Sequence, residues 1–143
     1  MTDIGTVEAY RAQEASYADS PVHRALGLSV EVAGRGEVRI QYDGALAATN
    51  RRGHPAGGAL AEMIDSAVVQ AAKTLLHPDD RVTTLELKIN FVRAAPAGSP
   101  LTTTGSLRHV GRSTAVGLGE IRDSAGVLLA VGLVTVSIRR HDA

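Results

Sequence analysis

The sequence contains no cysteine among its 143 residues. Disulfide bonds, thiolate zinc sites, iron–sulfur clusters and cysteine nucleophiles are therefore excluded. A chain of this length can bury a sizeable hydrophobic core without such cross-links, and it is typical of a single domain. We therefore expect a folded domain that is stabilised by its core alone.

Aromatic residues and excess charge are also scarce. The chain has no Trp, three Tyr and one Phe, and its 15 basic residues balance its 15 acidic residues. Nucleic-acid-binding proteins normally carry a basic surface, and proteins that bind single strands need aromatic side chains for base stacking. The composition therefore argues against a nucleic-acid partner.

Long apolar runs are missing as well. Residues 1–8 lack the basic patch and the following apolar run that mark a signal peptide. The uncharged stretch over residues 124–138 is too short to cross a bilayer as a helix. We therefore expect a cytoplasmic protein without a membrane partner.

Apolar periodicity predicts one long helix among strands. Alternation over residues 26–32 and 38–42, with glycines between them, predicts a β-hairpin. The Ala-rich segment 58–76 predicts a helix, and residues 4–18 are compatible with a shorter one before Pro21. Four further strands with short connections, which favour antiparallel neighbours, are expected over residues 82–93, 100–110, 113–123 and 127–139.

The long helix has an unusually wide apolar sector. Its polar side chains fall in one narrow arc, which contains Glu62, Ser66, Gln70 and Lys73. A helix with so broad an apolar surface is expected to be enclosed by a sheet and not merely to rest on one. Glycines within the expected strands would let the sheet bend around it.

Asp65 is the first candidate for a chemical role. It lies in the apolar sector of the helix, where a carboxylate loses hydration and becomes a candidate base or nucleophile. The alternative is a carboxylate at the edge of the core that caps a loop amide. Glu62, one turn earlier, is expected on a solvated or salt-bridged face.

Gly57 and Gly58 form the second candidate site, at the start of the same helix. Free backbone N–H groups point outward there, and the helix dipole favours negative charge. Without Cβ atoms a carbonyl oxygen can come close, so the pair could bind an oxyanion; the alternative is a flexible entry into the helix. Since Asp65 lies about two turns away, a two-fold partner could place its own Asp65 opposite this Gly57.

Other residues give weaker signals. Arg93 and Arg112 are either ordinary surface charges or phosphate ligands. No metal site is expected, because none of the histidines has a partner at ligand spacing. These histidines, for which a surface or structural role is expected, are His23, His54, His77, His109 and His141.

Several stretches together resemble a known family. They are Asn50-x-x-Gly53 before Gly57-Gly58-Ala59-Leu60, Met63-Ile64-Asp65-Ser66-Ala67, residues 83–93, Ala94-Ala95-Pro96, Gly111-Arg112-Ser113 and residues 123–130. In this order and spacing, over about residues 25–139, the chain resembles hot-dog-fold acyl-CoA thioesterases of the phenylacetate-degradation (PaaI-like) type.

The resemblance implies an α+β fold in which a curled antiparallel sheet wraps a long central helix. Residues 25–143 would form this hot-dog domain, and residues 1–24 would form an N-terminal helical extension. The resemblance also implies a homodimer with active sites at the subunit interface, and usually a homotetramer. No cofactor is implied, because CoA is part of the substrate.

The resemblance also implies roles for particular residues. Gly57 would donate its N–H to the thioester carbonyl, the partner subunit's Asp65 would attack the carbonyl or activate water, and Asn50 would help to hold the thioester or the water. The remaining residues expected at the substrate are Gly58, His54, Val69, Arg93, Arg112 and Ser113.

The sequence departs from the family at one position. Family members usually carry His immediately before the glycine pair, where this chain has Ala56, although His54 lies two residues earlier. Two alternatives to a thioesterase follow: an acyl-CoA-binding protein with weak or no catalysis, and a hydratase. A hydratase normally needs a His paired with the acid, and Asp65 has no such His.

Overall fold

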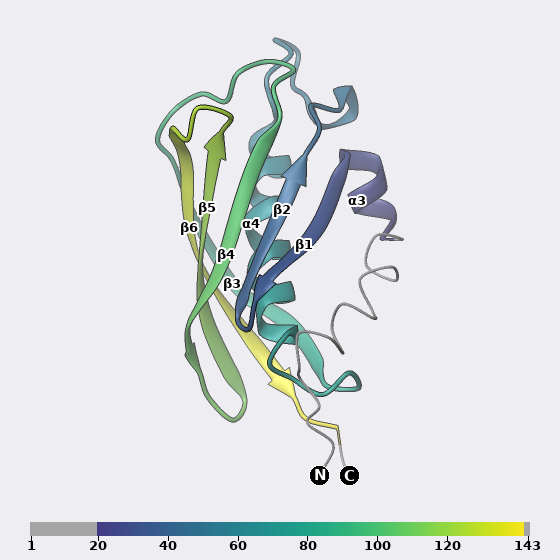
Figure 1. Cartoon of the computed structure of the whole chain (residues 1–143), viewed down its shortest axis with the longest axis vertical. Helices are drawn as coiled ribbons and strands as arrows, with labels where there is room; N and C mark the ends of the chain where they lie inside the picture. Colours follow the sequence, from purple (N-terminus) through teal and green to yellow (C-terminus); the bar gives the residue numbers. More distant parts are fainter. Residues whose placement is uncertain (1–19, 142–143) are drawn as a thin grey trace.

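A single long helix, α4 (Gly57–Lys73), is packed against a six-stranded antiparallel sheet (Figure 1). The computed structural model describes residues 20–141. The strands are β1 (Leu28–Gly34), β2 (Glu37–Tyr42), β3 (Arg81–Phe91), β4 (Leu101–Val110), β5 (Thr114–Asp123) and β6 (Leu128–Arg139). Two short helices, α3 (Pro21–Leu26) and the 3-10 helix η1 (Leu46–Ala48), flank the first hairpin.

The strand order β1-β2-β4-β5-β6-β3 differs from the meander expected over the last four strands. β4, β5 and β6 are consecutive neighbours, but β3 pairs with β6 at one edge, while β4 pairs with β2. The connection between β3 and β4 contains Pro96 and Pro100, which cannot donate to a hairpin ladder. Instead of turning back beside β3, the chain crosses to the middle of the sheet.

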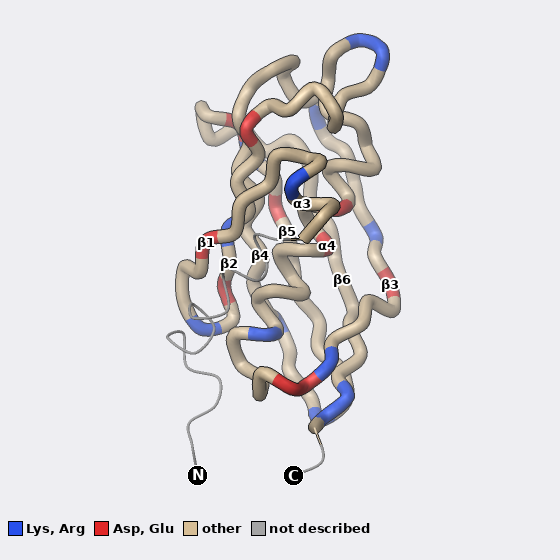
Figure 2. The backbone as a smooth tube through the Cα atoms, turned by 90° about the vertical axis from the view of Figure 1, so that its right-hand side faces the viewer, with Lys and Arg blue, Asp and Glu red and all other residues tan. Residues whose placement is uncertain are grey.

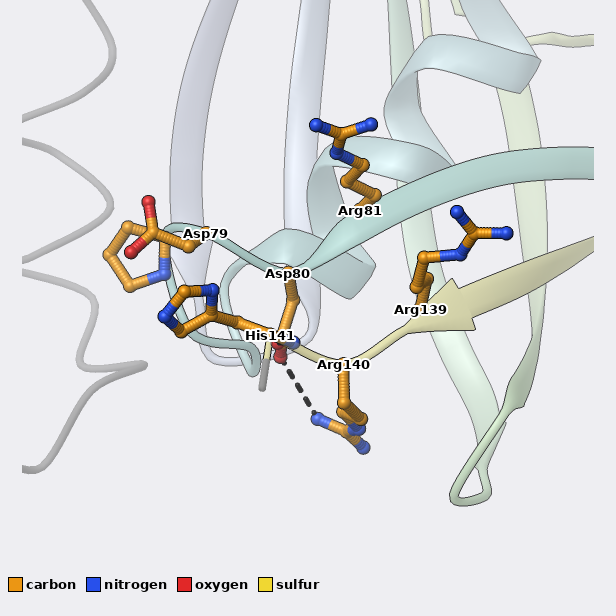
Figure 3. A pocket seen from close by; sticks show the side chains of 7 residues that line it. Asp79, Asp80, Arg81, Arg139, Arg140 and His141 are labelled. Atoms are coloured by element: carbon orange, nitrogen blue, oxygen red, sulfur yellow. Dashed lines mark hydrogen bonds and ion pairs between the residues drawn. The ribbon is translucent and has the colours of Figure 1, made fainter. Parts of the chain in front are cut away.

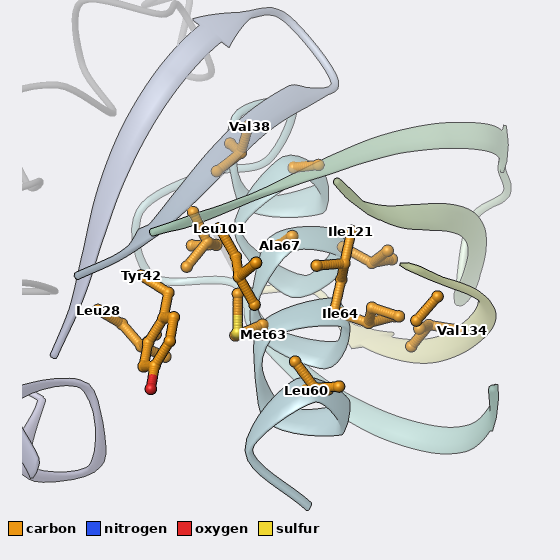
Figure 4. Close-up of a cluster of buried hydrophobic side chains, with 14 of the residues drawn as sticks. Leu28, Val38, Tyr42, Leu60, Met63, Ile64, Ala67, Leu101, Ile121 and Val134 are labelled. Atoms are coloured by element: carbon orange, nitrogen blue, oxygen red, sulfur yellow. The ribbon is translucent and has the colours of Figure 1, made fainter. Parts of the chain in front are cut away.

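The sheet encloses the helix, as the wide apolar sector predicts. α4 contacts all six strands, and its buried face includes Met63, Ile64 and Ala67 (Figure 4). These side chains meet residues of the sheet such as Leu101 and Ile121, both of which are buried. The α+β architecture of a helix wrapped by an antiparallel sheet is therefore confirmed.

Glycines allow the helix to approach the sheet closely. A Cβ atom at Gly105 would lie 2.5 Å from the Ala67 carbonyl oxygen, and one at Gly119 would lie 2.8 Å from Ile64 Cγ2. Any side chain at these positions would push α4 away from the strands. The sequence predicted that the strand glycines let the sheet bend; the contacts at Gly105 and Gly119 show that they make room for the helix.

The helices of the structure can be compared with those predicted from the sequence. The helix expected over residues 4–18 lies outside the described residues. α4 begins at Gly57 and ends at Lys73, whereas the sequence predicted a helix over residues 58–76. None of the helices within residues 20–141 is long and apolar enough to cross a membrane.

Substitution of Gly105 tests the close contact between α4 and the sheet. Gly105→Ala is expected to lower the free energy of unfolding by about 3 kcal/mol or more, because the new methyl group meets helix backbone that cannot rotate away. Gly34→Ala is the matched control, since a Cβ there has no heavy atom within 4 Å, and a change within about 0.5 kcal/mol is expected. Urea unfolding at one protein concentration measures both; equal stability of the two variants would contradict this packing.

Candidate functional site

The start of α4 presents two backbone amides without partners. Ala56 is the N-cap, in an extended conformation with φ −68° and ψ 146°, and no side chain caps the helix. The N–H groups of Ala59 and Leu60 donate to the Ala56 carbonyl. Within residues 20–141 no hydrogen bond engages the N–H of Gly57 or Gly58, and both residues are exposed. Their amides and the helix dipole therefore create a site for negative charge.

The loop before α4 is held in place by its own hydrogen bonds. The N–H of Ala56 donates to the carbonyl of Ala48 at 2.7 Å, and the N–H of Asn50 donates to the carbonyl of His54 at 2.7 Å. Asn50 Oδ1 accepts from the N–H of Arg52 at 2.9 Å. The carbonyl of the Asn50 side chain therefore stabilises the loop, while its amide nitrogen keeps two donors for a ligand.

His54 anchors this loop to the connection between β3 and β4. Its Nδ1 lies 2.7 Å from the carbonyl oxygen of Ala95. Because a carbonyl oxygen only accepts, Nδ1 is the protonated nitrogen, and in the neutral ring Nε2 is an acceptor. His54 thus fixes the loop, and in the neutral ring its Nε2 can accept a hydrogen bond from water or an amide.

A hollow of about 500 Å³ lies at the start of α4 and is lined in part by Gly57. It brings together four of the residues that the sequence singled out: Asn50, His54, Gly57 and Arg93. Phe91, at the end of β3, forms part of its wall, and the ring would lie 3.4 Å from a Cβ placed at Gly57. The absence of a side chain at Gly57 therefore keeps the amide accessible between the ring and the loop.

Asp65 lies further along α4, half-buried, and is held by Thr84. The Thr84 hydroxyl donates to Asp65 Oδ1 at 2.6 Å. Thr84 directly precedes a β-bulge, where the pairing of β3 with β6 shifts between Thr84 and Glu86, and bulges often re-aim a side chain next to a site. No role was predicted for Thr84 from the sequence. The available signal was its position two residues after Val82, which places its hydroxyl on the same face of β3 as that core-facing side chain.

The predicted residues do not all meet within one chain. The eight residues from Gly57 to Asp65 correspond to a rise of about 12 Å, and Val69 lies one turn further. Arg112 and Ser113 are in the turn between β4 and β5, at the other end of the sheet (Figure 1). There the Arg112 carbonyl accepts from Arg140 Nε at 3.2 Å, and the Ser113 carbonyl accepts from the N–H of Ile138 at 2.7 Å.

The polar arc of α4 is more buried than its pattern suggested. His23 of α3 lies over it, with Nε2 2.7 Å from Ser66 Oγ and 3.7 Å from Glu62 Oε1. Ser66 and Gln70 are each only 6% exposed, so the arc is a packed polar layer. Sequence patterning missed this because it could not show that α3 folds back onto the helix. The prediction of a surface or structural histidine is met by His23, which is buried and structural.

Burial shifts the pKa values of two side chains in this layer. Burial, and then the negative charge of Asp65, raise the pKa of Glu62. Burial lowers the pKa of His23. Both shifts favour the neutral forms of these side chains.

No metal centre emerges from the described part of the chain. Within residues 20–141, no three His, Asp or Glu side chains are arranged to hold a metal ion. The groups that could perform chemistry here are backbone amides, carboxylates, hydroxyls and the His54 ring.

A family model for the thioesterase superfamily matches residues 52–130, which is more than half of the chain. The matched stretch contains both Gly57 and Asp65. A comparison with curated protein sequences finds no match.

Solved structures share the fold over most of the chain. The Escherichia coli PaaI protein from the phenylacetic acid degradation operon is 23% identical, with a TM-score of 0.81 over 96% of this chain and 98% of that chain. A conserved protein from Pseudomonas aeruginosa is 28% identical, with a TM-score of 0.79 over 87% and 98% of the two chains. A putative thioesterase from Ralstonia eutropha JMP134, described as related to phenylacetic acid degradation, is 26% identical, with a TM-score of 0.78 over 90% and 98%.

The family model and the structural similarity both indicate a thioesterase-type fold. The match includes the glycine pair, the helix and the acid on it, and the fold is the one that the PaaI-type structures share. The chain therefore belongs to the thioesterase superfamily and has the hot-dog fold of its PaaI-like members.

Proposed function

We propose that the protein is an acyl-CoA thioesterase that hydrolyses its substrate to a carboxylic acid and CoA. The observation that carries this proposal is the Gly57 amide at the start of α4, which has no hydrogen-bond partner within residues 20–141 and belongs to a residue that lines a hollow. Membership of the thioesterase superfamily supports the reaction class. The acyl-CoA substrate and the residue roles are part of the proposal, and we expect the activity in the cytoplasm.

The Gly57 amide would stabilise the charge that develops in the reaction. As the carbonyl carbon becomes tetrahedral, its oxygen turns into an oxyanion, which the Gly57 N–H and the helix dipole meet. One such donor typically lowers the barrier by about 3–4 kcal/mol. The Asn50 amide nitrogen lies at the same hollow, where it would donate to the thioester or to the attacking water.

Asp65 would supply the base or the nucleophile. As a base, its carboxylate takes a proton from water while the water oxygen bonds to the carbonyl carbon; the C–S bond then breaks and CoA leaves as a thiolate, which takes up a proton. Such a group typically contributes about 10²–10⁴-fold. Thr84 holds one carboxylate oxygen, which leaves the other free for this step.

The two groups would meet across a dimer interface. β3 is an edge strand, and its Leu85 and Phe91 are 61% and 53% exposed. An exposed apolar edge of this kind favours pairing with another strand. A two-fold pairing of β3 strands would continue the sheet and let the Asp65 of each protomer face its partner's helix start. A homotetramer built from two such dimers belongs to the same proposal.

The rest of the hollow would receive the two ends of the substrate. Arg93 carries a positive charge at the hollow beside Gly57 and would bind CoA phosphates. Gly58 and His54 border the thioester, and Val69, one turn after Asp65, would contact the acyl group. No metal or separate cofactor takes part in this scheme.

Substitution of the acid separates an enzyme from a binding protein. Asp65→Asn is expected to lower the rate of thiol release from an acyl-CoA panel by at least about 100-fold, because the side chain can no longer take a proton. Glu31→Gln removes an exposed carboxylate on β1 and is expected to leave the rate unchanged. Tight acyl-CoA binding by the wild type without any thiol release would instead favour the non-catalytic alternative, which the Ala56 position suggests.

Proline at position 57 tests the amide itself. Gly57 is the first helical residue, where proline is tolerated, and the extended Ala56 suits a residue before proline. Gly57→Pro deletes the N–H and is expected to lower kcat by about 100-fold or more. Gly57→Ala retains the N–H and controls for the added carbon atom. Wild-type activity in Gly57→Pro would rule out the amide as the oxyanion donor.

A further inference from the structure

Two arginines face each other at the end of the sheet away from Gly57. In the antiparallel pairing of β3 with β6, Arg81 lies directly opposite Arg139. Directly opposed residues project from the same face of a sheet, and like charges there repel one another. Both side chains are exposed, and within residues 20–141 neither has an ion pair or side-chain hydrogen bond.

The two arginines border a hollow of about 620 Å³ (Figure 3). Arg81 and Arg139 extend to one side of the strands, whereas Arg140 turns to the other side and reaches Asp80. Basic residues thus gather where β3 begins and β6 ends, which is visible at the lower end of the molecule in Figure 2.

The two acidic residues at this hollow, Asp79 and Asp80, contact groups other than the opposed arginines. Asp80 accepts from the N–H of His141 at 2.7 Å, from the N–H of His77 at 3.1 Å and from Arg140 at 3.2 Å. Burial alone would raise the pKa of Asp80, but these hydrogen bonds hold it below its usual value. Asp79 is exposed, and its N–H donates to His77 Nδ1 at 3.1 Å. Within residues 20–141 neither carboxylate forms an ion pair with Arg81 or Arg139.

We propose that Arg81 and Arg139 form a binding site for a phosphate group. The planar guanidinium group matches the geometry of phosphate oxygens and donates two parallel hydrogen bonds. A dianion between the two groups would replace their repulsion with two attractive contacts. Arg140 holds Asp80 and the turn at Arg112 in place around the site.

The phosphate group can come from two sources. One is inorganic phosphate or another free phosphate ligand, and its binding does not depend on the proposed function. The other is the phosphorylated tail of CoA, and this source rests on the proposed function. In a two-fold pairing of β3 strands, the Arg81 end of one strand lies beside the Phe91 end of its partner, and hence beside the partner's thioester hollow.

Direct binding tests the site without any turnover. Calorimetric titration of the full-length protein with inorganic phosphate and with adenosine 3′,5′-bisphosphate, at constant ionic strength, is expected to show binding of at least one probe. Arg81→Gln/Arg139→Gln is expected to weaken it at least about tenfold, because ionic hydrogen bonds are lost. Arg39→Gln/Arg122→Gln removes the same formal charge from β2 and β5 and is expected to retain it.

The titration can overturn the site. Absence of binding for both probes, unchanged binding in Arg81→Gln/Arg139→Gln, or equal loss in the control variant would each contradict it. The melting temperature without phosphate checks folding: loss of the repulsion is expected to leave Arg81→Gln/Arg139→Gln at least as stable as the wild type.

Kinetics then distinguishes the two sources. If CoA supplies the phosphate, Arg81→Gln/Arg139→Gln raises KM for an acyl-CoA at least about tenfold but leaves KM for the matching acyl-pantetheine unchanged. If KM is unchanged for both while phosphate binding is lost, the site stands and takes a separate phosphate ligand. A protein without thioesterase activity would defeat the proposed function and leave the binding result intact.

Discussion

The fixed rise of an α-helix separates the Gly57 amide from the Asp65 carboxylate of the same chain. The two groups lie about 12 Å apart along α4, and the close contact of that helix with the sheet prevents it from bending to shorten the distance. A carbonyl carbon and the water that attacks it must lie about 3 Å apart. Under the proposed function, one chain would therefore offer two halves of a catalytic arrangement, and a second chain would have to complete it. The exposed edge of β3 would supply the surface for that contact.

Much of the secondary structure could be predicted because it depends on the local pattern of apolar and polar residues. The wide apolar sector of residues 58–76 indicated a helix enclosed by a sheet, and alternation indicated the strands. The position of β3 could not be obtained in this way, because strand order depends on which edges pair and not on the residues within a strand. Residues 92–100, with their two prolines, looked like a short antiparallel connection but carry the chain to the middle of the sheet.

Candidate site residues could be predicted where the type and position of a single residue suggested a chemical role. Gly57 and Asp65 stood out because bare amides at a helix start and an acid in an apolar sector are both unusual. Thr84 was missed, and the place of His23 over α4 was not foreseen, since each acts through a contact with a distant segment: Thr84 holds Asp65, and His23 covers Ser66. Arg112, which was expected at the CoA phosphates, lies at the end of the sheet where Arg81 and Arg139 meet.

Complementation between two inactive variants tests the shared site most directly. Asp65→Asn and Gly57→Pro each remove one half, so neither homodimer contains a complete site. If the halves come from different chains, mixed dimers regain one intact site, and random exchange of subunits restores about a quarter of wild-type activity. If both halves came from the same chain, no dimer in the mixture would contain a complete site. Activity would then stay at the level of the separate variants, which would contradict the account.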